Sequence, residues 1–251
     1  EYPDKYRFEK EFPESADQAL APPKSLAAFD TDKLDAMRVD VRGPVEQVVV
    51  GAGVANIYQG FVPGKRYAAA TDTSHGTGND DAVTVVVDIV TGYVVADIQT
   101  ALLPPDQMAA ASVKLLGRYD NPIWAIEDNE WGILTLATAM GMRYPRIYYR
   151  DEGKPGWYTD ERTRFDLWGD LMAAVNSRLL TVPSAAGLGQ FYSVIRNPAK
   201  LGRIEAQKGA HDDYPMAIGM AWQVRQYARP AGMGVGVERQ FQVGPRRGSR
   251  G

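Results

Sequence analysis

The sequence predicts an α/β fold in which a mixed β-sheet is covered by helices. Three observations lead to this class. Runs of apolar and β-branched residues between positions 67 and 126 are bounded by turn residues, as in buried strands. Thr91-Gly92 separates two such runs and indicates a hairpin turn. Segments with helical apolar spacing come next, so hairpin-joined strands precede strand–helix units.

The strands are short and end at recognisable turn residues. Because a right-handed crossover can place the fourth strand beside the first and parallel to it, we expect these two to be neighbours near the centre of the sheet. The five predicted strands of the main sheet cover residues 67–71, 82–89, 93–98, 122–126 and 146–149.

The helices alternate with the later strands. Pro104 and Pro105 precede the first, since proline is favoured in a first helical turn, and Gly141 ends the second. The predicted helices cover residues 103–119, 131–140, 159–180, 183–197 and 211–228, and residues 202–207 form a further short strand.

Composition limits the classes of function. The chain has 251 residues and a formal net charge of −3, so nucleic-acid binding would require a local basic patch. It contains no cysteine, which excludes disulfides and thiolate metal sites. No apolar run is long enough to span a membrane. We expect a weakly patterned segment at 1–60, a domain at 61–229 and a flexible Gly/Arg-rich tail at 230–251.

Carboxylates stand at the ends of two strands that are predicted to be neighbours. Asp72 ends the first strand and Glu127 the fourth, so both would lie at one edge of the sheet. Asp212 and Asp213 begin the last helix. Packed carboxylates repel and lose hydration, so a proton or a cation must compensate. Without cysteine or a histidine triad, the cation expected is Mg²⁺ or Mn²⁺, and two ions about 4 Å apart suit in-line phosphoryl displacement.

Ordinary structural roles remain open for each of these residues. A strand-ending aspartate is often a turn former, and Asp212 or Asp213 alone would cap a helix. His211 either assists the site or caps the same helix. Asp80, after a glycine-rich turn, is either an auxiliary metal ligand or part of that turn. On the residues alone, a metal site and these structural roles are about equally favoured.

Two nucleotide-binding motifs are absent. The Gly51-x-Gly53 turn has Asn56 at the third glycine position, and the Gly64-Lys65 pair is followed by arginine instead of serine or threonine. Basic residues that could follow a phosphate backbone, although solvated charge is the default, flank the last predicted strand: Arg196, Lys200, Arg203 and Lys208.

Three stretches resemble a known family. "DTSHGTGNDDAVTVVVDIVTGYVVADIQTALLPP", "IWAIEDNEWG" and "GAHDDYPMAIGMAW" are similar, in order and spacing, to the nuclease domain of the large terminase subunit of tailed bacteriophages. This domain belongs to the RNase H/RuvC-like nucleases, so the resemblance implies an RNase H-like five-stranded mixed sheet flanked by helices. Residues 11–34 are similar to the segment that follows the terminase ATPase domain. Residues 1–60 are therefore expected to follow an ATPase domain whose motifs this chain lacks.

The resemblance implies a function and a set of partners. It implies an endonuclease that cuts concatemeric viral DNA with two Mg²⁺ or Mn²⁺ ions. By motif, Asp72, Glu127 and Asp213 are the expected catalytic metal ligands, with Asp212 as a further candidate. Expected partners are double-stranded DNA, the terminase ATPase domain or subunit, the portal ring and the small terminase subunit, in the host cytoplasm and without a membrane.

Two other functions remain open. A junction resolvase of the same superfamily would prefer four-way junctions to linear duplex. A non-catalytic module would dock on a portal ring or on DNA and use its carboxylates only as helix caps and turn formers.

Overall fold

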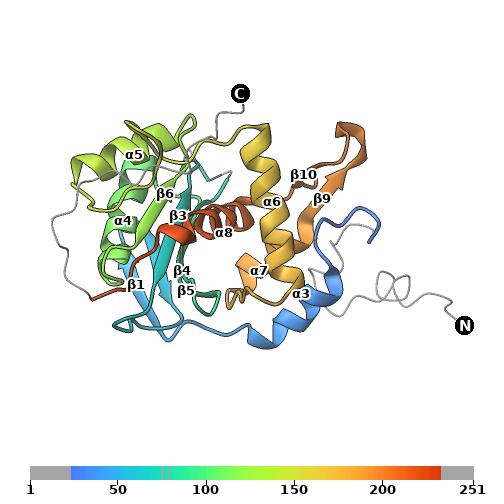
Figure 1. Cartoon of the computed structure of the whole chain (residues 1–251), viewed down its shortest axis with the longest axis horizontal. Coiled ribbons are helices and arrows are strands. Elements are labelled where there is room, and N and C mark those ends of the chain that lie inside the picture. The colour runs from blue at the N-terminus through green and yellow to red at the C-terminus, as the bar shows by residue number, and fades with distance from the viewer. Residues whose placement is uncertain (1–23, 75, 79, 233–251) are drawn as a thin grey trace, which may run out of the picture.

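The computed structural model describes residues 24–74, 76–78 and 80–232 (Figure 1). It confirms the predicted class: a mixed sheet flanked by helices. Strand order in the sheet is β1-β2-β5-β4-β3-β6. The strands are β1 (Glu46–Val50), β2 (Gly53–Ile57), β3 (Tyr67–Asp72), β4 (Ala82–Asp88), β5 (Tyr93–Thr100) and β6 (Ile123–Ile126).

Helices cover both faces of this sheet. The first three are α3 (Thr31–Met37), α4 (Pro105–Gly117) and α5 (Gly132–Gly141), and the last three are α6 (Glu161–Asn176), α7 (Ala185–Ser193) and α8 (Asp213–Val224). Two small hairpins complete the described fold. They pair β7 (Tyr149–Asp151) with β8 (Lys154–Pro155), and β9 (Val194–Asn197) with β10 (Arg203–Ala206). Figure 1 shows the β9–β10 hairpin projecting beyond α6.

The main sheet has six strands, where five were expected. β3 pairs antiparallel with β4 and parallel with β6, as predicted. The β1–β2 hairpin, which turns at Gly51 (φ 64°), adds two strands beside β5. Residues 146–149 do not form a strand of this sheet: only Ile147 bridges to Trp124 before the chain turns back into β7 and β8.

The segment after α7 is also corrected. Residues 183–197 were expected to be one helix, but α7 ends at Ser193 and residues 194–197 form β9. The β-branched Val194 and Ile195 pair there with β10, so strand pairing with a distant segment replaces the last helical turn.

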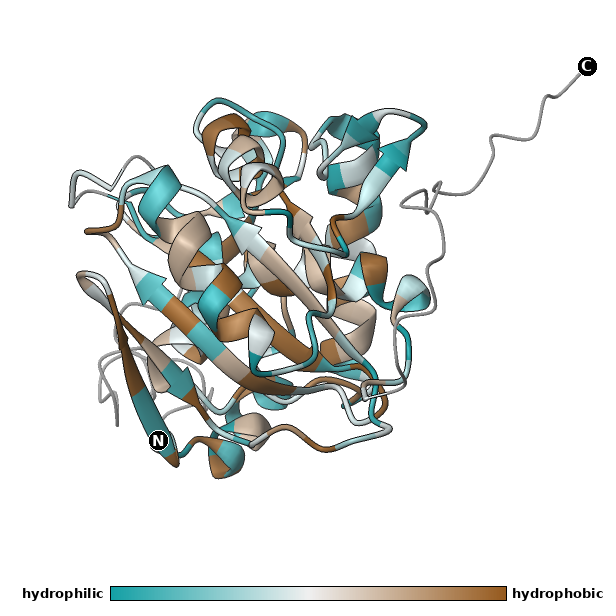
Figure 2. Ribbon diagram, turned by 90° about the vertical axis from the view of Figure 1, so that its left-hand side faces the viewer, coloured by the Kyte–Doolittle hydropathy of each residue, from teal (hydrophilic) through white to brown (hydrophobic). Residues whose placement is uncertain are grey.

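The two faces of the sheet bury different side chains. Ala68 and Ala70 of β3 pack with α6, α7 and α8, whereas Tyr67 and Ala69 pack with α4. This alternation is the two-residue period of a strand. Because both faces are covered, β4 is buried along its whole length. Figure 2 shows brown and tan stretches along the strands, interrupted by teal positions. Among the described residues, no helix combines the length and hydrophobicity needed to cross a membrane.

The described part of the expected N-terminal segment packs on the same core. Phe29 lies next to α3 and contacts the rings of Trp168 and Phe191 at centroid distances of 6.2 and 5.0 Å. The β1–β2 hairpin extends the sheet. The expected flexible tail at 230–251 lies outside the described residues from position 233 onward.

We expect Gly132→Ala to lower the stability of the protein. A Cβ at Gly132, the first residue of α5, would lie 1.7 Å from the backbone oxygen of Glu127. Overpacking of this kind costs about 1–3 kcal/mol, or roughly 2–12 °C in a thermal unfolding scan. Gly141→Ala at the other end of α5 is the control, because a Cβ there meets nothing within 4 Å. Equal melting temperatures for the two variants would contradict the prediction.

Candidate active site

The register of the sheet places Asp72 and Glu127 at one edge. Thr71 of β3 pairs with Ile126 of β6, and the Glu127 amide donates to the Thr71 carbonyl at 3.2 Å. The two-residue period then directs Asp72 to the face of Ala68 and Ala70, which is the α8 face. Glu127 follows Ile123 and Ala125, which bury on that face as well. Both carboxylates therefore lie under the first turn of α8.

A buried polar network on the opposite face fixes the ends of these strands. The Thr71 and Thr84 hydroxyls lie 2.7 Å apart, and Thr84 is 2.7 Å from the Ser112 hydroxyl on α4. Trp124 of β6 donates its indole N–H to Thr71 at 2.9 Å. Because buried hydroxyls are costly unless paired, this chain of bonds holds β3, β4, β6 and α4 in one arrangement.

The Asp72 and Glu127 carboxyl groups are close enough for the charge of one to affect the other. Burial, and then the negative charges of Glu127 and Asp213, raise the pKa of Asp72 well above its usual range. Glu127 is buried, and its Oε1 accepts a hydrogen bond of 2.5 Å from the Thr159 hydroxyl. The edge therefore concentrates negative charge that the surrounding residues do not neutralise.

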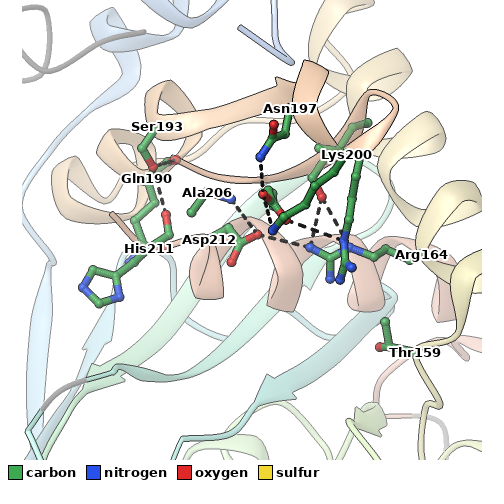
Figure 3. Close-up of polar contacts among 12 residues, drawn as sticks. Thr159, Arg164, Gln190, Ser193, Asn197, Lys200, Ala206, His211 and Asp212 are labelled. Atoms are coloured by element: carbon green, nitrogen blue, oxygen red, sulfur yellow. Dashed lines mark hydrogen bonds and ion pairs between the residues drawn. The ribbon is translucent and has the colours of Figure 1, made fainter. Parts of the chain in front are cut away.

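The two aspartates at the start of α8 have different environments. Asp212 Oδ2 accepts from the Ala206 amide at 3.2 Å and lies 3.5 Å from Arg164 (Figure 3). The charge of Arg164 opposes the rise that burial causes in the pKa of Asp212. Asp213 Oδ2 is buried and has no hydrogen-bond partner among the described residues. Burial and the charge of Asp212 raise the pKa of Asp213 to about 7.

The oxygens at this edge fit a hard divalent cation. Two buried oxygens there, Asp213 Oδ2 and Thr73 Oγ1, lack hydrogen-bond partners within the described ranges. Carboxylate and hydroxyl oxygens are the ligands that Mg²⁺ prefers. As the side chains stand, no three or more His, Asp or Glu groups of the described residues are spaced to enclose an ion. A third ligand, such as Asp213, would therefore have to turn toward Asp72 and Glu127 before an ion is enclosed.

His211 and Asp80 lie at the margin of the carboxylates. His211 Nδ1 is 3.5 Å from Asp213 Oδ2 and 3.8 Å from Asp80 Oδ1. Figure 3 shows the His211 ring turned away from Asp212. The neighbouring Asp81 accepts a 2.6 Å hydrogen bond from Gln99, which fits a structural role.

The four predicted DNA-binding residues differ in their surroundings in the structure. Lys200 and Arg203 both pair with Glu205 across the β9–β10 hairpin, and Arg196 donates to the Met172 sulfur. Lys208 forms no ion pair with any described residue. It lines a groove of about 360 Å³ between α7 and residues 207–211, together with His211 and small residues of α7. Lys208 is thus the one of the four that lines the groove at His211, and no ion pair with a described residue neutralises its charge.

Sequence reasoning missed several residues that position this site. Arg164 holds Asp212, and Thr159 holds Glu127. Asp97 in β5 is buried and accepts from the Tyr214 hydroxyl at 2.7 Å, which anchors the first turn of α8. No sequence pattern around Arg164 or Asp97 indicated that these residues contact the site. The helix start at Thr159-Asp160 was predicted, but nothing in the sequence indicated that Thr159 contacts Glu127.

Of the comparisons with known proteins, the one with solved structures found similar folds. No family model matches the chain, and no curated protein matches it. The large terminase nuclease of thermophilic phage G20c with bound cobalt is similar at a TM-score of 0.61 and 15% identity, over 80% of this chain and 98% of that one. The same nuclease with bound magnesium gives a TM-score of 0.60 at 15% identity, with the same coverage.

A nuclease from a second phage has the same architecture. The large terminase nuclease domain of Thermus phage P74-26 matches with a TM-score of 0.56 and 15% identity, over 76% of this chain and 94% of that one. At these identities the likeness concerns architecture, and it agrees with the RNase H-like arrangement expected from the sequence. This chain therefore has the fold of the phage large terminase nucleases.

Proposed function

We propose that this chain is a metal-dependent DNA endonuclease and the nuclease part of a viral genome-packaging terminase. The observation that carries the proposal is the convergence of Asp72, Glu127 and Asp213 at one sheet edge under the first turn of α8. Their mutual repulsion calls for a bound cation, and the fold is one that phage terminase nucleases use.

Mg²⁺ or Mn²⁺ is the proposed cofactor, with two ions. Divalent ions at such a site supply Lewis acidity for phosphodiester hydrolysis. Asp72, Glu127 and Asp213 would hold them, with Asp213 favoured over Asp212 because Arg164 and Ala206 already occupy an oxygen of Asp212. His211, beside Asp213 and at the groove, is placed to orient substrate or water. Structures of the G20c nuclease with cobalt, magnesium and zinc support a divalent ion.

The groove beside His211 would receive the phosphate backbone. Lys208 contributes an unpaired positive charge there, and the small residues Ala185, Ala186 and Gly189 leave room for the strand. The paired Lys200 and Arg203 would contribute less, because Glu205 neutralises them.

Lys208→Ala is expected to weaken DNA binding in a salt-dependent way. Loss of one phosphate contact should reduce the slope of log affinity against log salt by about 0.9. Lys200→Ala is the matched control, since its ammonium lies 2.8 Å from Glu205 and is already paired. Fluorescence anisotropy with a labelled duplex at several salt concentrations measures both slopes. A larger change for Lys200→Ala would show that DNA follows the hairpin instead of the groove.

The partners follow from the proposed role. The chain would act on double-stranded DNA together with a terminase ATPase domain or subunit, the portal ring and the small terminase subunit, in the host cytoplasm. The fold shared with terminase nucleases supports this assignment.

Plasmid cleavage tests the proposed function. Supercoiled plasmid incubated with the protein and Mn²⁺ or Mg²⁺ should become nicked and linear, and EDTA should stop the reaction. A parallel assay with a four-way junction and a linear duplex of the same length separates a junction resolvase from a terminase-type nuclease. No cleavage of any of these DNAs, together with no metal binding in calorimetry, would favour a docking module.

A further inference from the structure

The Thr159 hydroxyl makes the one hydrogen bond that the structure gives to the Glu127 side chain from outside the carboxylate group. The distance from Thr159 Oγ1 to Glu127 Oε1 is 2.5 Å. Threonine is neutral and does not compensate the charge of the carboxylates. Its effect on Glu127 is therefore one of orientation.

The backbone on both sides of Thr159 is fixed. On one side the Trp157 amide donates to the Ile126 carbonyl at 2.7 Å, and the Asp128 amide donates to the Trp157 carbonyl at 2.5 Å. This pair of bonds extends the edge of β6, so the segment that leads to Thr159 is held against the strand that leads to Glu127.

On the other side, Thr159 directly precedes a complete helix cap. Asp160 and Thr163 form a capping box at the start of α6, with side-chain to backbone bonds of 2.7 and 2.8 Å. The Thr163 hydroxyl also donates to the Tyr158 carbonyl at 2.8 Å. A capping box satisfies two amides that would otherwise be unpaired, and so it is a stable anchor for the residue before it.

The bond to Thr159 limits the rotation of Glu127. A free glutamate side chain loses rotamer entropy when it is fixed, and here the hydroxyl fixes it before any ligand arrives. With Oε1 bonded to Thr159, the carboxyl group is held at the sheet edge that it shares with Asp72. Supporting partners of metal ligands act in this way, and their loss typically lowers metal affinity about 10- to 100-fold.

We infer that Thr159 is a positioning residue that holds Glu127 in the orientation needed to bind a divalent cation together with Asp72. The inference rests on the proposed metal site. It adds a residue that would not itself be a metal ligand. It also means that the start of α6 helps to hold the site in place.

The test compares Thr159→Val, which keeps the shape and removes the hydroxyl, with Thr159→Ser, which keeps the hydroxyl. Calorimetric titration with Mn²⁺ should give Thr159→Val a dissociation constant about 10- to 100-fold above that of the unaltered protein. Thr159→Ser should restore most of the affinity. Thr138→Val, the same substitution in α5, is the control and should bind Mn²⁺ normally.

Thermal unfolding in EDTA separates positioning from folding. Metal-free Thr159→Val should melt somewhat below the unaltered protein, because the buried Glu127 carboxylate loses its donor. The separate sign of a positioning role is a smaller rise in melting temperature on adding a fixed Mn²⁺ concentration. In the cleavage assay, its Mn²⁺ activation midpoint should rise, and saturating Mn²⁺ should recover most of the rate.

Two results would overturn the inference, and they differ from failure of the nuclease proposal. Unchanged Mn²⁺ affinity in Thr159→Val would remove the positioning role while leaving cleavage by the unaltered protein intact. An equal loss of affinity in Thr159→Ser would show that packing, and not the hydroxyl, matters. If the unaltered protein binds Mn²⁺ but cuts no DNA, the nuclease proposal fails and the calorimetric comparison still decides the role of Thr159.

Discussion

Asp72→Asn is expected to reduce plasmid nicking in Mn²⁺ by more than about 100-fold, which is the upper end of the loss produced by residues that only support metal ligands. The amide keeps the shape of the side chain but removes the charge that binds the cation. The charges of Glu127, Asp213 and Asp212 all raise the pKa of Asp72, so Asp72 lies among the carboxylates of the proposed site. A neutral residue at this position therefore weakens the whole site.

The substitution should leave the fold intact. Removal of one negative charge from a group of mutually repelling carboxylates relieves repulsion in the metal-free protein. Circular dichroism and thermal unfolding in EDTA should therefore match or exceed those of the unaltered protein. Asp166→Asn, which changes an exposed aspartate of α6, is the control and should cut normally. Normal nicking by Asp72→Asn would remove the residue from the proposed mechanism.

Metal-free protein should lose stability as the pH rises from about 4 to about 7. The pKa of Asp213 is raised from 3.8 to about 7 in the folded protein, mainly by burial. Between these two values the folded state holds more protons than the unfolded chain. The derivative of the unfolding free energy with pH is then negative, so stability is highest near pH 4 and levels off above pH 7.

Asp213→Asn should remove the part of that loss that comes from Asp213, while the raised pKa values of Asp72 and Asp212 keep the remainder. At pH 8 in EDTA, the variant is expected to be more stable than the unaltered protein by about 2–4 kcal/mol, or roughly 4–16 °C in melting temperature; the upper value is the full shift of the pKa from 3.8 to about 7. At pH 4 the two proteins should melt together. Addition of Mn²⁺ at pH 8 should reverse the order, because only the unaltered protein retains the full set of ligands. A variant that is less stable than the unaltered protein at pH 8 in EDTA would contradict this account.

The sequence contained enough to predict where the carboxylates meet. Strand patterns at residues 67–71 and 122–126 are local, and a parallel pairing of those strands places Asp72 and Glu127 at one edge, as β3 and β6 do. The start of α8 was also recognisable, because apolar spacing follows Asp213 without interruption. These features needed only neighbouring residues and one topological rule.

The remainder depends on contacts between distant segments. The β1–β2 hairpin joins the sheet through β5, about 40 positions further along the chain, so its own pattern did not reveal its partner. β9 forms because it pairs with β10. The apolar spacing of residues 183–197 indicates a helix and gives no information about this partner. Thr159 lies 32 positions from Glu127, and Arg164 lies 48 positions from Asp212. A single threonine or arginine at such a separation gives no sign in the sequence of the residue that it will contact.

The bond between Tyr214 and Asp97 limits how the site can be adjusted. Asp97 is buried in β5, where Asn56, Tyr58 and Tyr214 all donate to it. A sliding movement of α8 along the sheet would remove one of the three donors from this buried carboxylate. The hydrogen bond therefore ties the helix that carries Asp213 to β5. Small torsional changes in the neighbouring loops cost less free energy than a movement of α8. Substitutions at Asn56 or Tyr58, neither of which is a proposed ligand, should therefore change the position of the helix that carries Asp213.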